Sequence, residues 1–571
     1  MTKTVQKTVQ PTAAKTAAKT AEPAVATKAE TKAETKAGWA VIGMLAAAQF
    51  IMVLDTTVMN VSISQITADL NTTIVGLQTA ITLYTLVMAA FMLIGGKLGD
   101  RWGAKRAYAV GLLVYGAGSL ITSLSPNLTV LLIGWSIIEG LGAILVIPAI
   151  AALTASTYAG RQRALAYGIL GGVSGASAAL GPLIGGWVTA TFTWRLVFAG
   201  ETVVVLLLML FLRAIPAAPG RKARLDFGGA LLSAAGLGMV VFGILRSSQW
   251  GWITPKAAAP FTLLGLSPVF WLIVAGVCFL GFFVRREEKV MAAGGGPLLD
   301  IGLLKIPRMR AGLNIYLSQQ FMIMGMFFVL PLYLQTVLGY NSLQTGITIL
   351  PLSLSLFVCA LLGAWLSARM PPKRIVSVGL WTMLIGVVLL IAFTGPDLRD
   401  IGFAVALALV GAGNGLLVSQ LGNVIMSSVA PERGSEAGGL QGTAMNLGAS
   451  LGTAIAGSIL IASLVTNFQA AVVQNPALID VSSELASVAE QNANFVSVEE
   501  VRTAAGEAGL TTVQVDAIAA EYQDAQIAAL KAAFAVVAVC ALVALWYVHH
   551  IPAQAEAEPV QQRKSRAAPA T

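Results

Sequence analysis

The sequence is poor in charge, cysteine and histidine. Asp, Glu, Lys and Arg make up 11% of its 571 residues, about half the share expected of a soluble domain. The three cysteines, Cys278, Cys359 and Cys540, all lie in apolar runs, so neither a disulfide framework nor a metal cluster is predicted. The two histidines, His549 and His550, end the last apolar run. No phosphate-binding loop, metal-ligand spacing or nucleophile with a base is present, which excludes an ATP-driven pump and gives no support to an enzyme.

Long apolar runs dominate what remains. Hydrophobic residues make up 56% of the chain and its mean hydropathy is +0.78. Runs of roughly 20 apolar residues recur from Trp39 to His550, and each is long enough to cross a bilayer. An all-α polytopic membrane protein with fourteen transmembrane helices is therefore predicted. The expected spans are 39–62, 77–97, 106–124, 129–152, 163–190, 194–214, 226–245, 263–285, 309–336, 344–367, 374–394, 401–426, 438–466 and 526–549.

The placement of charge predicts the orientation. With fourteen spans both termini share one side, and 30 of the 36 Lys and Arg residues lie on that side. Because basic residues concentrate in cytoplasmic loops, we expect both termini in the cytoplasm and the chain in the cell inner (cytoplasmic) membrane. Residues 1–38, which repeat Ala, Lys, Thr and Glu, are expected to form a disordered cytoplasmic tail, and 550–571 a second tail. The net charge is +9, but the sequence has no basic groove with interleaved aromatics of the kind that nucleic-acid binding needs. Nucleic-acid binding is therefore not expected.

One external segment, 467–525, is long and acidic. It carries nine Asp and Glu residues against a single base, Arg502. Parts of it have the pattern of amphipathic helices. We expect a solvated cap lying on the membrane surface; the alternative is a segment that gathers cations at an outer mouth.

The chain contains an internal repeat. GGKLGDRWGAKRAYAVG and GAWLSARMPPKRIVSVG share their basic and glycine positions, and LQTAITL matches LQTGITI. These pairs predict two homologous bundles of six helices in parallel orientation, an arrangement used by transporters that rock two bundles around a central site. The predicted regions are an N-terminal bundle at 39–214, two inserted helices at 215–290, and a C-terminal bundle at 291–549 that includes the external loop 467–525.

Only three of the 27 carboxylates fall well inside predicted spans: Asp55, Glu139 and Glu201. No Lys or Arg does. A charged side chain at mid-bilayer costs several kcal/mol, so such residues are usually functional. We predict that these three carry protons, Asp55 and Glu139 foremost. The alternatives are that Asp55 bonds to nearby polar groups of its own helix and that Glu201 pairs with Arg195.

The loop GGKLGDRWGAKR (95–106) resembles the signature between helices 2 and 3 of the major facilitator superfamily. The resemblance extends over nearly the whole chain outside the N-terminal tail and the acidic loop. In that family this cluster latches the cytoplasmic faces of the two bundles together when the carrier is open to the outside. The resemblance assigns this conformational latch to Gly96, Gly99, Asp100, Arg101, Gly103 and Arg106.

Two further motifs narrow the resemblance to fourteen-helix drug:proton antiporters. GASAALGPLIGG (175–186) resembles the antiporter motif of helix 5, carried here by Gly181, Pro182, Gly185 and Gly186, where small residues allow close helix packing. LDTTVMNVSI (54–63) resembles the motif of helix 1 in the same family. One position departs from the family pattern: Ser136 stands where helix 4 usually carries an arginine, which puts the usual proton pathway in doubt.

The resemblance implies proton-coupled efflux by alternating access, with small-molecule substrate, protons and the lipid bilayer as partners, no cofactor or metal, and the monomer as the working unit. Because the second half lacks an embedded acid, monocationic or neutral amphipaths are expected rather than dications. Alternatives are a dedicated exporter of one metabolite, antibiotic, siderophore or lipid, or a proton-coupled importer. Embedded polar residues that could bind substrate are Asn60, Gln319, Gln320, Asn414, Gln420, Asn423 and Asn446.

Overall fold

The computed structural model describes residues 28–158, 160–216, 220, 226–256, 258–367, 369–396, 401–429, 434–491 and 494–551. Throughout these residues the regular structure is helical, apart from one isolated bridge between Leu263 and Leu266. Twelve of the helices are long and apolar enough to cross a membrane, and the bent helix α7 (Gly160–Thr191) makes a thirteenth. Helix α4 (Ala104–Ser123), with Lys105 and Arg106 in its first turn, takes the remaining one of the fourteen predicted places.

The helices follow the predicted order of six, two and six. The first six spans are α1 (Lys28–Val61), α3 (Ile74–Trp102), α4, a fourth span made of three consecutive elements, α7, and α8 (Arg195–Phe211). The three elements of the fourth span are α5 (Leu128–Leu131), η1 (Leu132–Glu139) and α6 (Gly140–Thr157). The two between the halves are α9 (Phe227–Trp250) and α10 (Pro268–Ala292). The last six are α11 (Pro307–Leu332) with η4 (Tyr333–Val337), α12 (Ser342–Leu366), α13 (Pro372–Phe393), α14 (Ile401–Met426), α15 (Gly434–Gln474) and α18 (Thr512–Val548).

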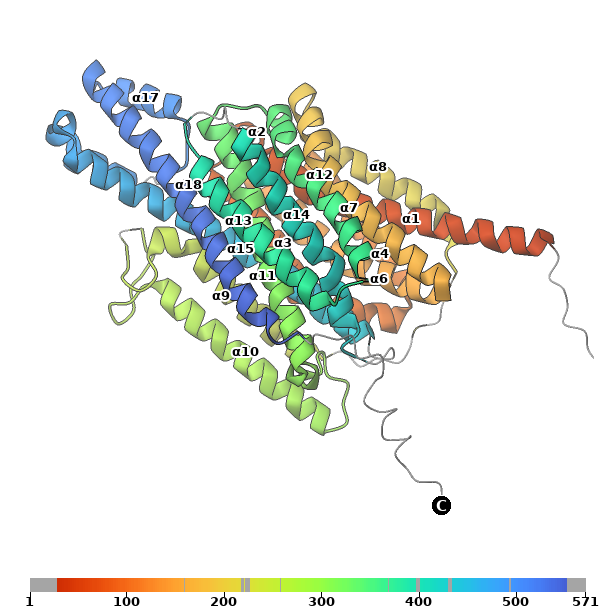
Figure 1. The fold of residues 1–571 in the computed structure, drawn as a ribbon. Coiled ribbons are helices and arrows are strands. Elements are labelled where there is room, and N and C mark those ends of the chain that lie inside the picture. The colour runs from red at the N-terminus through yellow and green to blue at the C-terminus, as the bar shows by residue number, and fades with distance from the viewer. Residues whose placement is uncertain are drawn as a thin grey trace, which may run out of the picture.

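The two halves meet along two helix pairs. Helix α3 packs on α15, and α7 packs on α12. Helix α9 rests against α15 and α3, whereas α10 packs mainly on α9 and lies at the edge of the molecule (Figure 1). The inserted pair therefore covers one side of the bundle interface and leaves the other helix pairs in contact.

Short elements connect the long helices. They are α2 (Ile63–Asp69), η2 (Leu212–Ala214), η3 (Ile301–Lys305), η6 (Pro476–Val481), α16 (Ser482–Gln491) and α17 (Val498–Glu507). We call the end of the molecule where α1 begins and α18 ends the terminal end, and the opposite end the cap end.

The largest difference from prediction concerns the acidic segment. Helix α15 runs to Gln474 and α18 begins at Thr512, so most of the expected loop 467–525 is helical and continues two spans. At 1.5 Å per residue the 41-residue α15 is about 60 Å long, roughly twice the hydrocarbon thickness of a bilayer. The described residues of 464–526, which we call the cap, project away from the bundle (Figure 1). The structure shows that α15 and α18 carry the cap outward from the bundle, and the expected position of the cap on the membrane surface stays a prediction.

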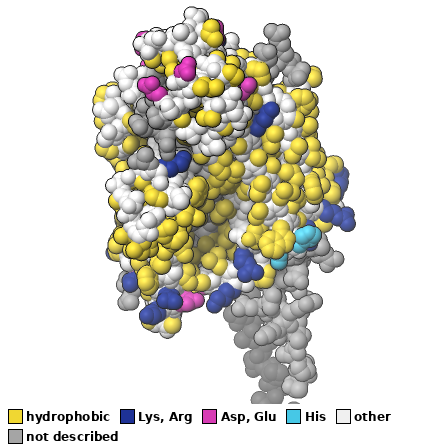
Figure 2. All heavy atoms as spheres, turned by 90° about the vertical axis from the view of Figure 1, so that its left-hand side faces the viewer, with side chains coloured by type: hydrophobic (Ala, Val, Ile, Leu, Met, Phe, Trp, Pro, Cys, Tyr) yellow, Lys and Arg dark blue, Asp and Glu magenta, His cyan; other side chains and the backbone are white. Residues whose placement is uncertain are grey.

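The tails are described only in part. Helix α1 begins at Lys28, so residues 28–38, which we expected in an unstructured tail, extend the first span. Residues 1–27 and 552–571, the rest of the two predicted tails, lie outside the described part of the chain. Charge separates along the molecule: most Asp and Glu side chains on the face in Figure 2 gather at the cap, and Lys and Arg predominate toward the other end.

Candidate functional site

The three embedded carboxylates come together in one cluster. Asp55 on α1, Glu139 at the end of η1 and Glu201 on α8 each offer an oxygen atom, and these atoms all lie within 4.8 Å of one another. The side chains are 0%, 0% and 2% exposed. Residues separated by up to 146 positions in sequence therefore form a single buried acidic site inside the N-terminal bundle; we call these three residues the carboxylate triad.

Each carboxylate has different polar neighbours. The Trp135 indole Nε1 donates to Asp55 Oδ1 at 2.7 Å, and Tyr84 stacks on Trp135 with ring centroids 4.6 Å apart and an interplanar angle of 5°. The hydroxyls of Tyr115 and Ser119 each donate to Glu201 Oε2 at 3.3 Å. The triad is thus surrounded by neutral donors from α3, α4 and η1, and among the described residues no Lys or Arg pairs with it.

Four oxygen atoms of the triad have no hydrogen-bond partner: Asp55 Oδ2, Glu201 Oε1 and both oxygens of Glu139. A buried carboxylate without partners is costly as an anion, and three negative charges this close repel one another strongly. The cluster therefore cannot be fully ionised in this arrangement. Sites of this kind bind and release protons as a group rather than as independent residues.

Close helix packing holds the triad in place. A Cβ atom on Gly118 of α4 would lie 2.6 Å from the Glu139 backbone nitrogen, so only glycine allows α4 and η1 to approach this closely. The segment Leu132–Glu139 is a π-helix, a wider turn that often marks a functional position in a helix. Trp135 and Glu139 both lie on this widened segment and are both buried.

Ser136 occupies the position at which the family pattern expects an arginine. Its hydroxyl donates to the Ala80 carbonyl oxygen of α3 at 2.8 Å, and the side chain is fully buried. An arginine here would therefore meet the α3 backbone. The missing base is not replaced by Arg195, which donates to Asp69 at 2.8 Å and to the Ser125 carbonyl oxygen at 3.0 Å. The alternative that Arg195 pairs with Glu201 is wrong.

The predicted antiporter motif packs at the interface between the halves near the cap end. A Cβ on Gly185 would lie 2.6 Å from Val58 Cγ2 of α1, and one on Gly181 would collide with Thr57. A Cβ on Gly186 would collide with the Ser342 carbonyl oxygen of α12. One helix, α7, thus contacts α1 of its own bundle and α12 of the other, and Pro182 lies inside it.

A glutamine that was not predicted closes the same end of the molecule. The Gln335 side chain on η4 donates to the Val61 carbonyl oxygen at 2.6 Å and accepts from the Ser64 hydroxyl at 2.6 Å. It joins the C-terminal half to the segment that follows α1. The sequence signal that could have revealed it, a polar residue in an apolar run, is shared by many other positions.

The predicted latch lies where α3 turns into α4 at the terminal end. Gly103 makes this turn with a φ of 87°, a conformation that favours glycine. Two lysines outside the predicted set contact other segments: Lys97 donates to the Pro297 carbonyl oxygen and Lys105 to the Ile215 carbonyl oxygen. Pro297 lies in the connection between α10 and α11, so Lys97 joins the first half to the segment that leads into the second. The latch roles of Asp100, Arg101 and Arg106 stay predictions.

Most of the predicted substrate-binding amides are hydrogen-bonded to other groups of the protein. Gln319 donates to Asn414 Oδ1 at 2.5 Å between α11 and α14, and Gln420 donates to the Gly363 carbonyl oxygen at 2.9 Å. Asn60 and Asn446 donate to carbonyl oxygens of their own helices. These bonds join helices or stay within one, the alternative role of such residues. Gln320 is half-buried and Asn423 is exposed.

Several residues around the triad escaped prediction because they look ordinary in sequence. Tyr84, Tyr115, Ser119 and Trp135 are common residues of apolar helices. Their spacing did carry a signal: Trp135 and Glu139, and likewise Tyr115 and Ser119, are four positions apart and therefore share a helix face. Glu287 was also missed; it is fully buried at the end of α10 and accepts from the Leu299 backbone nitrogen at 2.9 Å.

The fold and the site define a polytopic α-helical membrane protein built from two six-helix halves, with an acidic cluster buried in the first. Comparison with known proteins makes this specific. The family model of the Major Facilitator Superfamily matches residues 45–284 and 227–453. The chain belongs to this superfamily, and it is accordingly a membrane transporter rather than an enzyme.

Curated relatives match about three quarters of this chain and have names connected with resistance and export. The chain is 31% identical to a puromycin resistance protein of Streptomyces alboniger over 430 residues, which cover 74% of this chain and 81% of the relative. It is 28% identical to the methylenomycin A resistance protein of Bacillus subtilis, covering 74% and 88%. It is 26% identical to the multidrug resistance protein Stp of Mycobacterium tuberculosis CDC 1551, covering 73% and 74%.

Solved structures agree on the fold. A bacterial homologue of the human lysosomal transporter Spinster, in an inward-facing and occupied conformation, superimposes with a TM-score of 0.58 at 15% identity, covering 91% of this chain and 98% of that one. The same protein in its unoccupied state gives a TM-score of 0.56. At this identity the likeness extends to the fold alone.

Proposed function

We propose that this chain exports amphipathic small molecules, monocationic or neutral, across the cytoplasmic membrane in exchange for protons. The carboxylate triad is the observation that carries the proposal: three buried acids within 4.8 Å, surrounded by neutral donors, form a site that can gain and lose protons. The names of curated relatives, which include antibiotic and multidrug resistance proteins, support outward transport. Both termini lie in the cytoplasm, and the monomer is the working unit.

The triad lies next to the machinery that would move. Asp55 is two residues before Thr57 and three before Val58, the α1 residues against which Gly181 and Gly185 of α7 pack. Helix α7 in turn contacts α12 of the other half. A change in the protonation of Asp55 alters its bond to Trp135 and so shifts α1. Because α1 packs on α7, this shift alters the contact between the bundles. Alternating access follows when this contact opens and the terminal end closes.

Transport in proteoliposomes tests the proposal. An imposed pH gradient should drive ethidium, a fluorescent monocation, in sodium-free buffer. Asp55→Asn and Glu139→Gln should each lower the gradient-driven rate by about tenfold or more, because neither replacement can carry a proton. A rate that survives both changes, or a rate that needs sodium, would contradict proton coupling by the triad.

A narrower exporter of one product is the second candidate. Relatives named as an actinorhodin transporter and a tetracenomycin C resistance and export protein favour it. This alternative predicts that a pH gradient drives no movement of ethidium but does drive the movement of a single native compound. Screening hydrophobic compounds for competition in the same vesicles separates a broad from a narrow range.

A further inference from the structure

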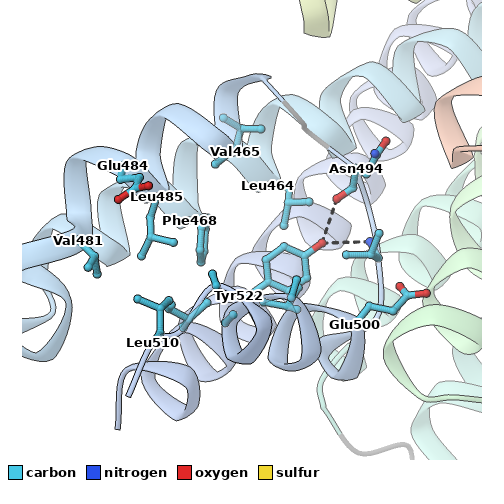
Figure 3. Close-up of a pocket in the computed structure, with 17 residues that line it drawn as sticks. Leu464, Val465, Phe468, Val481, Glu484, Leu485, Asn494, Glu500, Leu510 and Tyr522 are labelled. Atoms are coloured by element: carbon cyan, nitrogen blue, oxygen red, sulfur yellow. Dashed lines mark hydrogen bonds between the residues drawn. The ribbon is translucent and has the colours of Figure 1, made fainter. Parts of the chain in front are cut away.

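The cap encloses a cavity far from the carboxylate triad. Its volume is about 500 Å³, and its walls are the end of α15, the helices α16 and α17, and the first turns of α18 (Figure 3). Pockets that hold drug-sized ligands usually measure 300–1,000 Å³. The space is therefore large enough for a small organic molecule.

The cavity wall is mostly apolar and well fixed. Phe468 of α15 and Tyr522 of α18 meet edge to face, with ring centroids 5.6 Å apart. The Tyr522 hydroxyl donates to the Asn494 carbonyl oxygen at 3.0 Å and accepts from the Val496 backbone nitrogen at 3.1 Å. Leu464 and Ile518 are 2% exposed. An apolar hollow held open by a satisfied hydrogen-bond network is typical of a binding site rather than of a packed core.

The charges on and around this wall have one sign. Glu484 and Glu500 line the cavity and lie toward its opposite ends (Figure 3). The only base in the segment 467–525, Arg502, forms an ion pair with Asp516. The segment 467–525 thus carries nine acids against this one base. An apolar surface beside carboxylates favours a molecule with an apolar body and a positive charge.

We propose that the cap cavity is a second binding site of the transporter and takes monocationic amphipaths. The class of ligand rests on the function proposed above, because it is the class expected as cargo. The site lies on the face opposite the termini, where exported molecules emerge. Cargo bound there is held outside the membrane by residues that do not take part in proton coupling.

Photolabelling of the purified full-length protein in nanodiscs tests this site. The probe is ethidium monoazide, and labelled peptides are mapped by mass spectrometry. Label is expected within 464–522. Ala505→Phe and Ala508→Phe each add a ring to the cavity from α17 or its end, the first from a buried and the second from an exposed position, and each should lower cap labelling by about tenfold.

A matched pair of variants tests the charge. Glu500→Gln keeps an acceptor for the Ser497 backbone nitrogen, which Glu500 now caps, but it removes a negative charge from the wall. It should lower cap labelling about threefold, the size expected for one partly exposed charge interaction. Glu507→Gln makes the same change on α17 at an exposed position outside the cavity and should leave labelling unchanged. Equal labelling in the two variants would overturn the preference for cations.

Further outcomes separate this site from the proposed transport function. Asp55→Asn should stop gradient-driven ethidium movement and keep cap labelling. Transport by the wild type without any label in 464–522 would overturn the cap site alone. Cap labelling without transport would leave the site standing and contradict the transport proposal. A phospholipid that copurifies with the wild type, is absent from both Phe variants and blocks the label would overturn the ligand class.

Discussion

Asp55, Glu139 and Glu201 are all buried, but they differ in the number and length of the hydrogen bonds that would stabilise a negative charge. Asp55 receives a 2.7 Å bond from an indole N–H, Glu201 receives two longer bonds from hydroxyls, and Glu139 receives none. Hydrogen bonds to an ionised group are about twice as strong as bonds between neutral groups. The three carboxylates thus differ in the hydrogen bonds that they accept, and the proposed proton exchange would involve three unequal groups whose oxygen atoms lie within 4.8 Å of one another.

Glu201→Gln should lower gradient-driven transport by about tenfold or more, because the triad then loses one of its three proton-carrying groups. The matched control is Asp69→Asn, which removes the acid that pairs with Arg195 at 2.8 Å and lies outside the triad. It should change the rate by less than about twofold, since an exposed ion pair contributes little. Vesicle transport with an imposed pH gradient measures both. Equal losses would mean that Glu201 has only a structural role.

Asp226 gives a prediction for stability against pH. It precedes α9, accepts from the backbone nitrogens of Gly228 and Gly229, and pairs with Arg286 of α10 at 2.7 Å. The Arg286 hydrogen bonds, helped by the backbone N–H groups, lower the pKa of Asp226 below its ordinary value of 3.8. A pKa that is lower in the folded state means that this stabilisation is complete above about pH 4 and is lost as the pH falls through the folded value.

Asp226→Ala should therefore lower the apparent melting temperature at pH 7, with a cost of about 1 kcal/mol for the lost helix cap. The difference from wild type should shrink as the pH falls below 3.8 and through the lower pKa of the folded state, below which the carboxyl is neutral in both states. The control is Glu288→Ala, an exposed acid on α10, for which little change is expected at either pH. A difference that stays constant across this pH range would contradict the account.

The hydropathy pattern was enough to identify the three triad residues, because a carboxylate inside an apolar run is rare. Their convergence could not be predicted, since it depends on the rotation of α1, η1 and α8 about their axes. The same limit explains why the partner of Arg195 could not be predicted. Glu201 is close to Arg195 in sequence and was therefore a possible partner, but in the fold the Arg195 side chain bonds to Asp69. The amides of the second half were predicted as substrate ligands, but embedded polar groups join helices as readily as they bind ligands. Their hydrogen bonds to other helices could not be foreseen from the sequence.

Among the elements, α7 links α1, which carries Asp55, to the contact between the halves. Its glycines allow α1 and α12 to approach on two sides, and a methyl group at Gly186 would collide with the α12 backbone. The motif itself was readable from the sequence, but its partners were not. Thr57 and Val58 lie two and three residues after Asp55, which places the motif one helix away from the triad.

Gly186→Ala should open the cap-end contact between α7 and α12, because backbone atoms cannot yield to a new Cβ as a flexible side chain can. The expected result is a longer distance between spin labels placed on the cap ends of α7 and α12, measured by pulsed electron spin resonance, together with slower transport. Gly172→Ala is the control on the same helix, because a Cβ there meets nothing within 4 Å. Unchanged distances in Gly186→Ala would contradict this role.

The ends of the elements were the least predictable part of the fold. Hydropathy marks where a helix is apolar, so it located the spans at their apolar cores. It could not locate the ends of α15 and α18, which continue into the cap with polar residues on one side. Capping residues did carry a signal there: Thr511 and Gln514 form a reciprocal capping box at the start of α18.

At the scale of the whole molecule, the proposed proton-coupling site and the proposed binding site in the cap occupy different parts. The carboxylate triad lies inside the N-terminal half, the halves meet along α3–α15 and α7–α12, and the cap extends from the C-terminal half (Figure 1). The internal repeat allowed the two halves and the inserted pair to be predicted. On the proposals made above, protons bind in the N-terminal half and cargo binds in the cap, so the two sites do not overlap.

Proton release from the purified protein tests this account most directly. In weakly buffered, sodium-free detergent solution, adding cargo such as ethidium should release protons from the wild type, detected with a pH indicator dye. The variant that combines Asp55→Asn, Glu139→Gln and Glu201→Gln should bind the same cargo and release none. Proton release of wild-type size from this variant would contradict the assignment of proton coupling to the triad.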